Sequence, residues 1–417
     1  MGNVAKDLHG SGARSGAWRV WGVWDAVAAF LLVFFSTVGF MYYLGGGGRA
    51  VTWPWNAPSL FALVSAAVVA AWVFLMSESR WQIPDGVATG LLCVILGVAV
   101  GVFAFCYPIW SPGSDSADAL EVGVRQLLHG HNPLGALTKL GHTLSPLLGG
   151  YLLAAPFVVL LGSVLLRGLF WLYVGVGYLV RAAGPRAALM FASLAVATPL
   201  IRGGLATQSD HFVIAIELAL LGSVGYFLCY RGRPSRWATV GYWASAALFG
   251  MALADRVVYW IVVIPLAAAF ARLPRRRDAV IWLATSVGVT ACLVLVLLVA
   301  NPTAFVAGPL GMALDKIVST HIPHSGLIVA LVATTLACLL SWRVRTLAGA
   351  FGVASLSLAT VFFLGGLVKA LAVGWNLAFL QSATAAPAVV YNGSWLVFGL
   401  FALALPTSRT SQLPPPG

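Results

Sequence analysis

Long apolar runs separated by short polar clusters make up most of this chain. Runs such as DAVAAFLLVFFSTVGFMYYL, PSLFALVSAAVVAAWVFLM and VATGLLCVILGVAVGVFAFCY each supply about the 20 residues that a helix needs to cross roughly 30 Å of hydrocarbon. Apolar runs bounded by arginine, proline or glycine clusters predict about twelve transmembrane helices, centred near positions 35, 67, 97, 172, 194, 221, 245, 265, 290, 333, 356 and 396. We therefore expect an all-α integral membrane protein.

One further apolar run, PLLGGYLLAAPFVVLLG at 146–162, is shorter and holds Pro156 in its middle. These features favour a re-entrant or interfacial helix over a thirteenth crossing. Together with the polar stretch before it, this run forms an outer loop, 110–162, the longest that we predict.

Composition agrees with a membrane class. Of 417 residues, 60% are hydrophobic and 9% are charged, and the mean hydropathy is +0.93. A single soluble globule could not cover so much apolar surface. We expect residues 1–417 to form one multispan domain, with a disordered tail at 406–417. The net charge of +12 indicates contact with anionic membrane lipids, and the chain has no nucleic-acid-binding motif.

Basic residues set the expected orientation, because lysine and arginine collect in cytoplasmic loops. With the N-terminus inside, sixteen of the 24 basic residues fall on the cytoplasmic side, including the clusters RGRPSR and RLPRRRD. Counting 146–162 as a crossing would invert every later loop. We predict a multi-pass protein of the plasma (inner) membrane with both termini cytoplasmic, six of the twelve acidic residues on the outer face and Glu217 within a span.

The outer loop holds an unusually polar stretch, SDSADALEVGVRQLLHGHNPL at 114–134. Its leucines and valine recur at helical spacing, at Leu120, Val124, Leu127 and Leu128. Gly130 and Pro133 supply a stop signal. The pattern predicts an amphipathic helix from about Ser116 to Leu128, with its polar residues on other faces. A purely structural role is open: Asp115 as a cap, Asp118 in the first turn, and Glu121 paired with Arg125.

Residues 110–270 resemble the polyprenyl-phosphate-dependent GT-C glycosyltransferases, especially actinobacterial multispan proteins of that superfamily. The likeness lies in the acidic outer loop with its NPL, SPL and PFVVLLG segments, in QSD at 208–210, and in GMALADRVVYWIVVIPL at 250–266. The resemblance implies a GT-C-like fold and transfer of a sugar from a polyprenyl-phosphate donor to a cell-envelope glycan or lipid acceptor on the outer face.

That chemistry needs a base, since an acceptor hydroxyl is a poor nucleophile at neutral pH. Asp115 and Asp118 are the candidate catalytic carboxylates, and one carboxylate suffices for an inverting single displacement. The departing lipid phosphate needs a cation, for which the outer-side candidates are Arg202, His211, Arg256 and Lys369. Arg256 follows Asp255, so a local ion pair is an equal alternative.

Other polar residues join the predicted substrate- and phosphate-binding set. Within the regions of resemblance these are Arg125, Asn132, His142, Gln208 and Asp210. Glu217 lies seven residues after Asp210, near the same helix face, and an ionisable group inside a span is costly unless it serves a function or finds a partner.

No cofactor is predicted beyond the lipid-linked donor. The histidines lack a metal-ligand spacing, so no metal ligands are assigned, although a divalent metal stays open. The five cysteines fall in apolar runs without a pairing pattern. Two other readings remain: a polytopic transporter or lipid or sugar flippase, and a non-catalytic GT-C-like membrane protein. The sequence specifies neither the oligomeric state nor the identity of sugar and acceptor.

Overall fold

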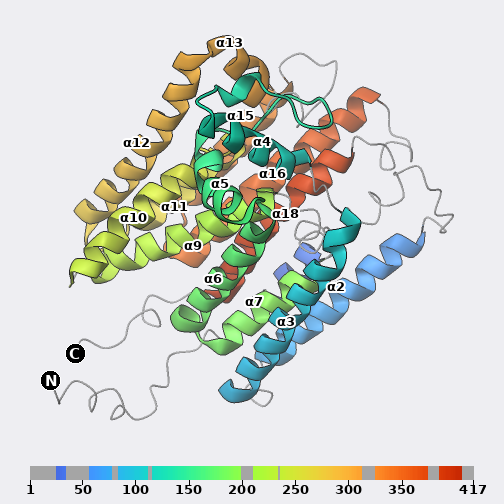
Figure 1. The fold of residues 1–417 in the computed structure, drawn as a ribbon. Coiled ribbons are helices and arrows are strands. Elements are labelled where there is room, and N and C mark those ends of the chain that lie inside the picture. The colour runs from blue at the N-terminus through green and yellow to red at the C-terminus, as the bar shows by residue number, and fades with distance from the viewer. Residues whose placement is uncertain are drawn as a thin grey trace.

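The computed structural model describes residues 25–33, 56–77, 83–110, 115–198, 210–232, 235–311, 325–373 and 385–405. Helices dominate these residues, and the bridge between Leu137 and Thr143 is an isolated β contact. A first helical segment covers 25–33. The labelled elements (Figure 1) are α2 Asn56–Ser77, α3 Asp85–Trp110, α4 Asp115–Leu128, η2 Pro133–Gly135, α5 Leu148–Leu161, α6 Leu165–Ala183, α7 Pro185–Ala197, α9 Asp210–Arg231, α10 Arg236–Leu253, η3 Val257–Val262, α11 Val263–Phe270, α12 Arg276–Ala300, α13 Pro302–Phe305, η4 Val306–Leu310, α15 Ser325–Ser341, α16 Leu347–Val373 and α18 Ala385–Ala404.

The all-α expectation is confirmed for the described residues. Eleven of the twelve expected centres lie inside helices, and the first, at 35, lies just outside the described range. The number of crossings is not confirmed. Four described helices are long and apolar enough to cross a membrane, namely α6, α9, α12 and residues 347–365 of α16, and seven other apolar helical stretches are shorter. For example, α7 has 13 residues and, at 1.5 Å per residue, is about 20 Å long.

Helix α9 forms the centre of the bundle (Figure 1). It contacts α6, α10, α12, α16 and α18, and every residue from Asp210 to Ser223 is buried. A helix that is apolar on all sides is stable only when other helices surround it. This position explains why α9 lacks an amphipathic pattern, and it places Asp210, His211 and Glu217 inside the protein.

The helical conformation is interrupted at residues 254–256, between α10 and η3. Two backbone carbonyls of this stretch accept hydrogen bonds from the beginning of α5. Leu147 N, just before the helix, donates to the Asp255 carbonyl at 2.8 Å, and Gly149 N, in its first turn, donates to the Ala254 carbonyl at 2.9 Å. Irregular backbone is tolerated inside an apolar protein when such partners exist. The interruption therefore fixes where residues 115–162 attach to the bundle. We call these residues the outer segment, after the outer loop that the sequence predicts.

Helix α5 has 14 residues with Pro156 inside it, as expected for a short helix. Helix α12, in contrast, links two distant regions. Its first turn holds Arg277, whereas Leu297 and the following Phe305 pack with Leu134 and Leu147 of the outer segment. At 1.5 Å per residue, its 25 residues place these regions about 37 Å apart.

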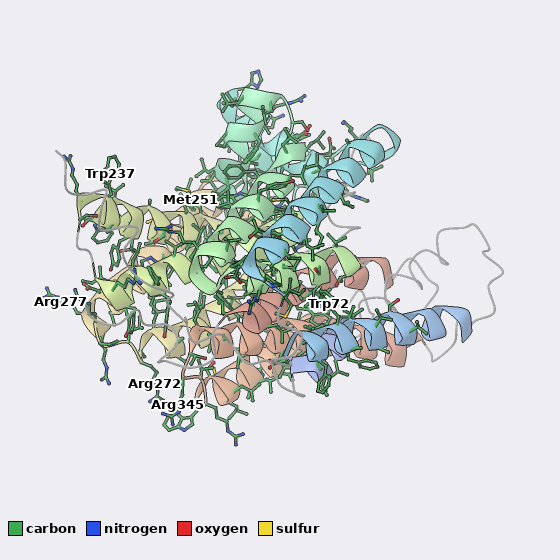
Figure 2. The ribbon with its side chains drawn as sticks, turned by 90° about the horizontal axis from the view of Figure 1, so that it is seen from below. Trp72, Trp237, Met251, Arg272, Arg277 and Arg345 are labelled. Atoms are coloured by element: carbon green, nitrogen blue, oxygen red, sulfur yellow. The ribbon has the colours of Figure 1, made fainter. Side chains whose placement is uncertain are left out.

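Arginines gather at the end of the molecule opposite the outer segment. Figure 2 shows Arg272, Arg277 and Arg345 reaching outward at the periphery. They come from the connection before α12, from α12 itself, and from the connection between α15 and α16, and α11 contacts both α12 and α15. Basic side chains are therefore gathered near the start of α12, together with Asp278, and the side of a membrane that this end faces stays a prediction.

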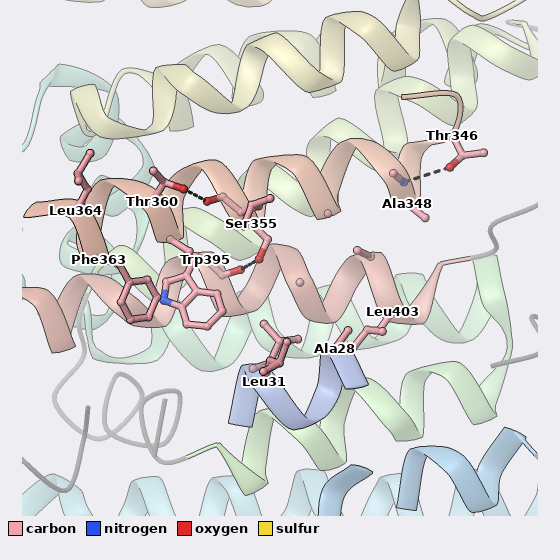
Figure 3. Close-up of a pocket in the computed structure, with 17 residues that line it drawn as sticks. Ala28, Leu31, Thr346, Ala348, Ser355, Thr360, Phe363, Leu364, Trp395 and Leu403 are labelled. Carbon is pink, nitrogen blue, oxygen red and sulfur yellow. Dashed lines mark hydrogen bonds between the residues drawn. The ribbon is translucent and has the colours of Figure 1, made fainter. Parts of the chain in front are cut away.

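An apolar groove lies between residues 25–33, α16 and α18 (Figure 3). Its volume is about 850 Å³, and the described residues that line it carry no charged side chain. The Ser355 hydroxyl donates to the Trp395 carbonyl and the Thr360 hydroxyl to the Leu356 carbonyl, both at 2.8 Å. With these hydroxyls already bonded, the described part of the lining offers apolar contact and no candidate catalytic group.

Candidate functional site

The amphipathic helix predicted in the outer loop is α4, and it begins one residue earlier than expected, at Asp115. Leu120 and Val124 are almost fully buried against α5, and Leu127 packs at the edge of the same cluster. Gly130 follows the helix with a φ of 73°, in the left-handed region that glycine adopts readily. The apolar face of α4 is therefore covered by protein.

A short hairpin, 137–143, folds back over the first turn of α4. Thr138 N donates to the His142 carbonyl at 2.8 Å, and Leu137 and Thr143 form the isolated bridge. Asp115 and Asp118 of α4 each contact a residue of this hairpin. Both predicted catalytic carboxylates thus contact the same loop, although they contact it differently.

Asp118 has little freedom to react. One carboxylate oxygen accepts from Lys139 N at 2.6 Å and the other lies 3.4 Å from Lys139 Nζ. Its side chain is 7% exposed, although it lies on another face of the helix than Leu120 and Val124, as expected. The reason is that the hairpin covers this face and supplies both an N–H and a cation to the carboxylate.

Asp115 is more accessible. Its Oδ2 lies 3.0 Å from His142 Nδ1, and the two side chains are 31% and 55% exposed. Its Oδ1 is enclosed, with no hydrogen-bond partner in the described part of the chain. A carboxylate with one oxygen oriented by an imidazole and one oxygen that accepts no hydrogen bond keeps the capacity to accept a proton.

Other predicted residues of the outer segment have structural contacts. Asn132 caps η2 by accepting from Leu134 N at 3.0 Å. Arg125 is largely exposed and lies 3.9 Å from Glu121, whose other oxygen accepts from Ser163 Oγ at 2.6 Å at the start of α6. The predicted pair of Glu121 and Arg125 is therefore present, and Glu121 also joins α4 to α6.

A second group of polar side chains is buried in the bundle beneath the outer segment. We call it the buried network; its members are Arg167 of α6, Asp210, His211 and Glu217 of α9, and Asp255 and Arg256 of the interruption after α10. Each member is 7% exposed or less. Charges enclosed in this way are stable only when they are paired.

Within the network, Arg167 pairs with Glu217 and also approaches Asp255. Its Nε and Nη2 donate to the two carboxylate oxygens of Glu217 at 3.0 and 2.8 Å, and Nη2 lies 3.5 Å from Asp255 Oδ2. This is a two-pronged guanidinium–carboxylate pair, which fixes geometry as well as charge. Glu217 therefore has the partner that an ionisable residue inside an apolar helix needs.

Arg256 pairs with Asp210 and also approaches Asp255. Its Nε and Nη2 both donate to Asp210 Oδ2, the former at 3.0 Å, and Nε lies 3.9 Å from Asp255 Oδ1. Its Nη1 donates to Ser145 Oγ of the outer segment. The alternative of a local pair with Asp255 is thus secondary to the longer-range pair with Asp210, and Arg256 links the network to the outer segment.

Tyr151 of α5 lies between the two groups. Its ring packs against Gly123 of α4, and it is fully buried with its hydroxyl unpartnered among the described residues. The preceding Gly150 lies against Asp255, because a Cβ there would stand 2.3 Å from Asp255 Oδ1. Ser145 and Gly150 therefore bring the outer segment against the network.

The predicted site residues thus divide into two sets. Asp210, His211, Glu217 and Arg256 come together in the buried network, whereas Asp115, Asp118, Arg125, Asn132 and His142 belong to the outer segment. Where the structure describes the chain, neither Asp115 nor Asp118 pairs with Arg256. Arg202 and Gln208 lie outside the described residues, and Lys369 lies in α16, where its side chain is not described.

Arg167, Asp255 and Tyr151 were not predicted as site residues. Arg167 carried a usable signal, since it is a charged residue at the start of an apolar run, GSVLLRGLFWLYVGVGYL. Tyr151 and the close approach of Gly150 to Asp255 depend on tertiary packing. The described residues contain no group of three or more His, Cys, Asp or Glu side chains that could hold a metal ion.

Comparison of the chain with protein-family models, with curated proteins and with solved structures gives no match.

Packing of α4 on α5 gives a direct test of the outer segment. Gly123→Ala would place a Cβ 2.1 Å from the Tyr151 ring. Because this overpacks the contact, we expect the free energy of unfolding to fall by about 1–3 kcal/mol. Thermal unfolding of the purified protein measures this loss of stability, and limited proteolysis reports whether residues 129–146 become accessible. The matched control is Gly86→Ala in α3, whose Cβ would meet nothing within 4 Å. Equal stability of both variants would contradict the described packing.

Proposed function

We propose that this chain is a multispan glycosyltransferase of the plasma membrane, similar to the GT-C class. It moves a sugar from a polyprenyl-phosphate donor to a cell-envelope glycan or lipid on the outer face. The proposal rests on the resemblance in sequence and on the chemistry of the outer segment. Its partners are membrane lipids, the donor and the acceptor.

Asp115 carries the proposal. It begins α4 on a segment that is attached to the bundle, and its enclosed Oδ1 is unpartnered among the described residues. His142 holds the other oxygen at 3.0 Å. This geometry favours Asp115 over Asp118, whose two oxygens are both engaged by Lys139.

In the proposed step, the acceptor oxygen attacks the anomeric carbon and its proton passes to Asp115. The bond between the anomeric carbon and the phosphate oxygen breaks, and its electron pair leaves with the polyprenyl phosphate. A single displacement of this kind inverts the anomeric configuration. Cations that stabilise the departing phosphate come from Arg202, Lys369 or, after rearrangement of its pair with Asp210, Arg256.

An apolar exterior supports the membrane part of the proposal. Little of α12 is buried, and large side chains such as Val94, Leu160 and Val299 are more than half exposed. Apolar surface on this scale marks a contact with lipid or with a partner. We propose that the four long helices and the shorter apolar helices share one bilayer, with the arginine-rich end inside and α4 outside.

Labelling of intact cells tests this orientation. In a background without the native cysteines, Leu140→Cys in the outer hairpin should react with an impermeant maleimide, and Arg277→Cys should react only after the cells are opened. Both positions are solvent-exposed, so burial does not limit either reaction. The reverse labelling pattern would rule out an outer-face site.

A carrier is the second candidate, because the pair of Arg167 and Glu217 lies within helices that could span a membrane. One assay separates the two functions. Full-length protein in vesicles is given a panel of radiolabelled polyprenyl-phosphate sugars with acceptors extracted from the host envelope. Formation of a labelled glycan supports the transferase. Movement of labelled donor between leaflets without transfer supports the carrier.

A further inference from the structure

The apolar groove of Figure 3 runs along a helix that is long and apolar enough to cross a membrane. It follows α16 from Thr346 to Phe363, a rise of about 26 Å at 1.5 Å per residue. Thr346 and Leu403 lie at one end, and Phe363 and Trp395, whose ring centroids are 6.1 Å apart, lie at the other. The hydrocarbon of a bilayer is roughly 30 Å thick, so the groove can hold an extended hydrocarbon chain.

The groove is open along its side. Of its large side chains, Leu31 and Phe363 are each 45% exposed and Leu356 is 50% exposed. Gly352 is exposed as well, and a Cβ there would meet one described atom within 4 Å, the Cβ of Ala402 at 4.0 Å. Uncovered apolar surface of this kind marks a contact with lipid or with a partner. A hydrocarbon chain can therefore enter from a surrounding bilayer without separating the helices.

Two arginines lie beside the Thr346 end of the groove. Arg343 and Arg345 belong to the connection between α15 and α16, both are exposed, and neither has an ion pair with a described carboxylate. Trp342, next to them, is 82% exposed. Exposed tryptophan and arginine together are typical of the level of the lipid headgroups. Figure 2 shows Arg345 reaching outward, so this end of the groove presents positive charge.

One ligand matches both the apolar lining and the charged end. Consecutive Cα atoms are about 3.8 Å apart, so Arg343 and Arg345 lie within about 12 Å of Thr346. We propose that the groove binds an anionic phospholipid, with one acyl chain between α16 and α18 and its phosphate paired with the two guanidiniums. An uncharged hydrocarbon or a zwitterionic lipid would fill the groove and leave both arginines without a counter-charge.

This proposal rests on the membrane placement proposed above and not on sugar transfer. The bound lipid would also join residues 25–33 to α16 and α18, since all three line the groove. Labelling of Leu140→Cys and Arg277→Cys reports on orientation alone, so its outcome is independent of whether the groove holds a lipid. Failure of the lipid site and failure of the proposed function are therefore distinguishable.

Native mass spectrometry of the full-length protein, given equal amounts of anionic phosphatidylglycerol and zwitterionic phosphatidylcholine, tests the groove. Wild type should retain phosphatidylglycerol in preference. Gly352→Leu fills the groove and should retain less than half as much of it. The matched control is Gly288→Leu, at an exposed glycine of α12 whose Cβ would meet nothing within 4 Å. Thermal unfolding checks that both variants fold.

Three outcomes of this measurement would overturn the proposal. One is a wild-type amount of lipid on Gly352→Leu. Another is a wild-type protein that retains no lipid, as expected if a further segment of the chain fills the groove. The third is a wild-type dimer that Gly352→Leu dissociates, because the groove would then belong to a second copy.

Arginine variants test the charged end separately and do not alter the packing of the groove. Arg343→Gln with Arg345→Gln should lower the ratio of retained phosphatidylglycerol to phosphatidylcholine by about tenfold. The control is Arg276→Gln with Arg277→Gln, which removes the same charge from exposed positions at the start of α12. An equal fall in both double variants would show that total charge and not this site sets the preference, and would overturn the proposal.

Discussion

Replacing Asp115 with asparagine is expected to lower the rate of sugar transfer by about 10²-fold or more. Asparagine keeps the shape of the side chain, yet its amide cannot accept the acceptor proton. The contact with His142 and the fold of α4 should persist, so protein abundance and donor binding should change little. Turnover by the purified variant, measured with the radiolabelled donor panel, checks this expectation.

Two other variants serve as comparisons for Asp115→Asn. Asp118→Asn should act mainly on the stability of the hairpin, because Asp118 engages the backbone and the side chain of Lys139. Asp85→Asn, a half-exposed carboxylate at the start of α3, should leave turnover unchanged. If Asp115 and Asp118 are both changed to asparagine and envelope glycans and transfer rates match wild type, the proposed function fails.

Loss of Arg167 is expected to have the largest effect on stability. Arg167→Met removes the cation that pairs with both Glu217 oxygens and lies near Asp255, and unpairing a buried charge costs about 3–5 kcal/mol. We expect a much lower yield of monodisperse protein and a lower midpoint in thermal unfolding. Arg125→Met is the matched control: Arg125 is 62% exposed, and its loss should change stability by less than about 0.5 kcal/mol.

A double variant separates charge from packing. Arg167→Met with Glu217→Leu replaces the ion pair by apolar side chains, which is often neutral or stabilising. It should therefore recover most of the stability lost in Arg167→Met. If the single variant unfolds at the wild-type temperature, the network does not hold the bundle together.

Local pattern was enough to predict the helices. Eleven expected centres lie in observed helices because an apolar run of this length satisfies its backbone groups most easily as a helix. The α4 helix also followed from spacing, since Leu120 and Val124 recur on one face and Gly130 follows the last turn. These features depend on residues within a few positions of one another.

The number of crossings did not follow from the same pattern. Hydropathy identifies apolar segments, but α7 and α11 end after 13 and 8 residues, at turns that the neighbouring helices accommodate. The interruption at 254–256 is likewise tolerated because Leu147 and Gly149 supply hydrogen-bond donors from more than a hundred positions earlier in the chain. A sequence window contains no information about such partners.

The sequence by itself determined the all-helical class, the amphipathic helix α4 and most of the polar residues worth considering. The tertiary structure alone decided how those residues are used. It pairs Glu217 with Arg167, fifty positions away, buries Asp118 under Lys139, and leaves one oxygen of Asp115 enclosed and unpartnered among the described residues. The physical reason is that a buried charge is stabilised by whichever partner packing brings within a few ångströms, and that partner is set by the arrangement of helices and not by distance along the chain.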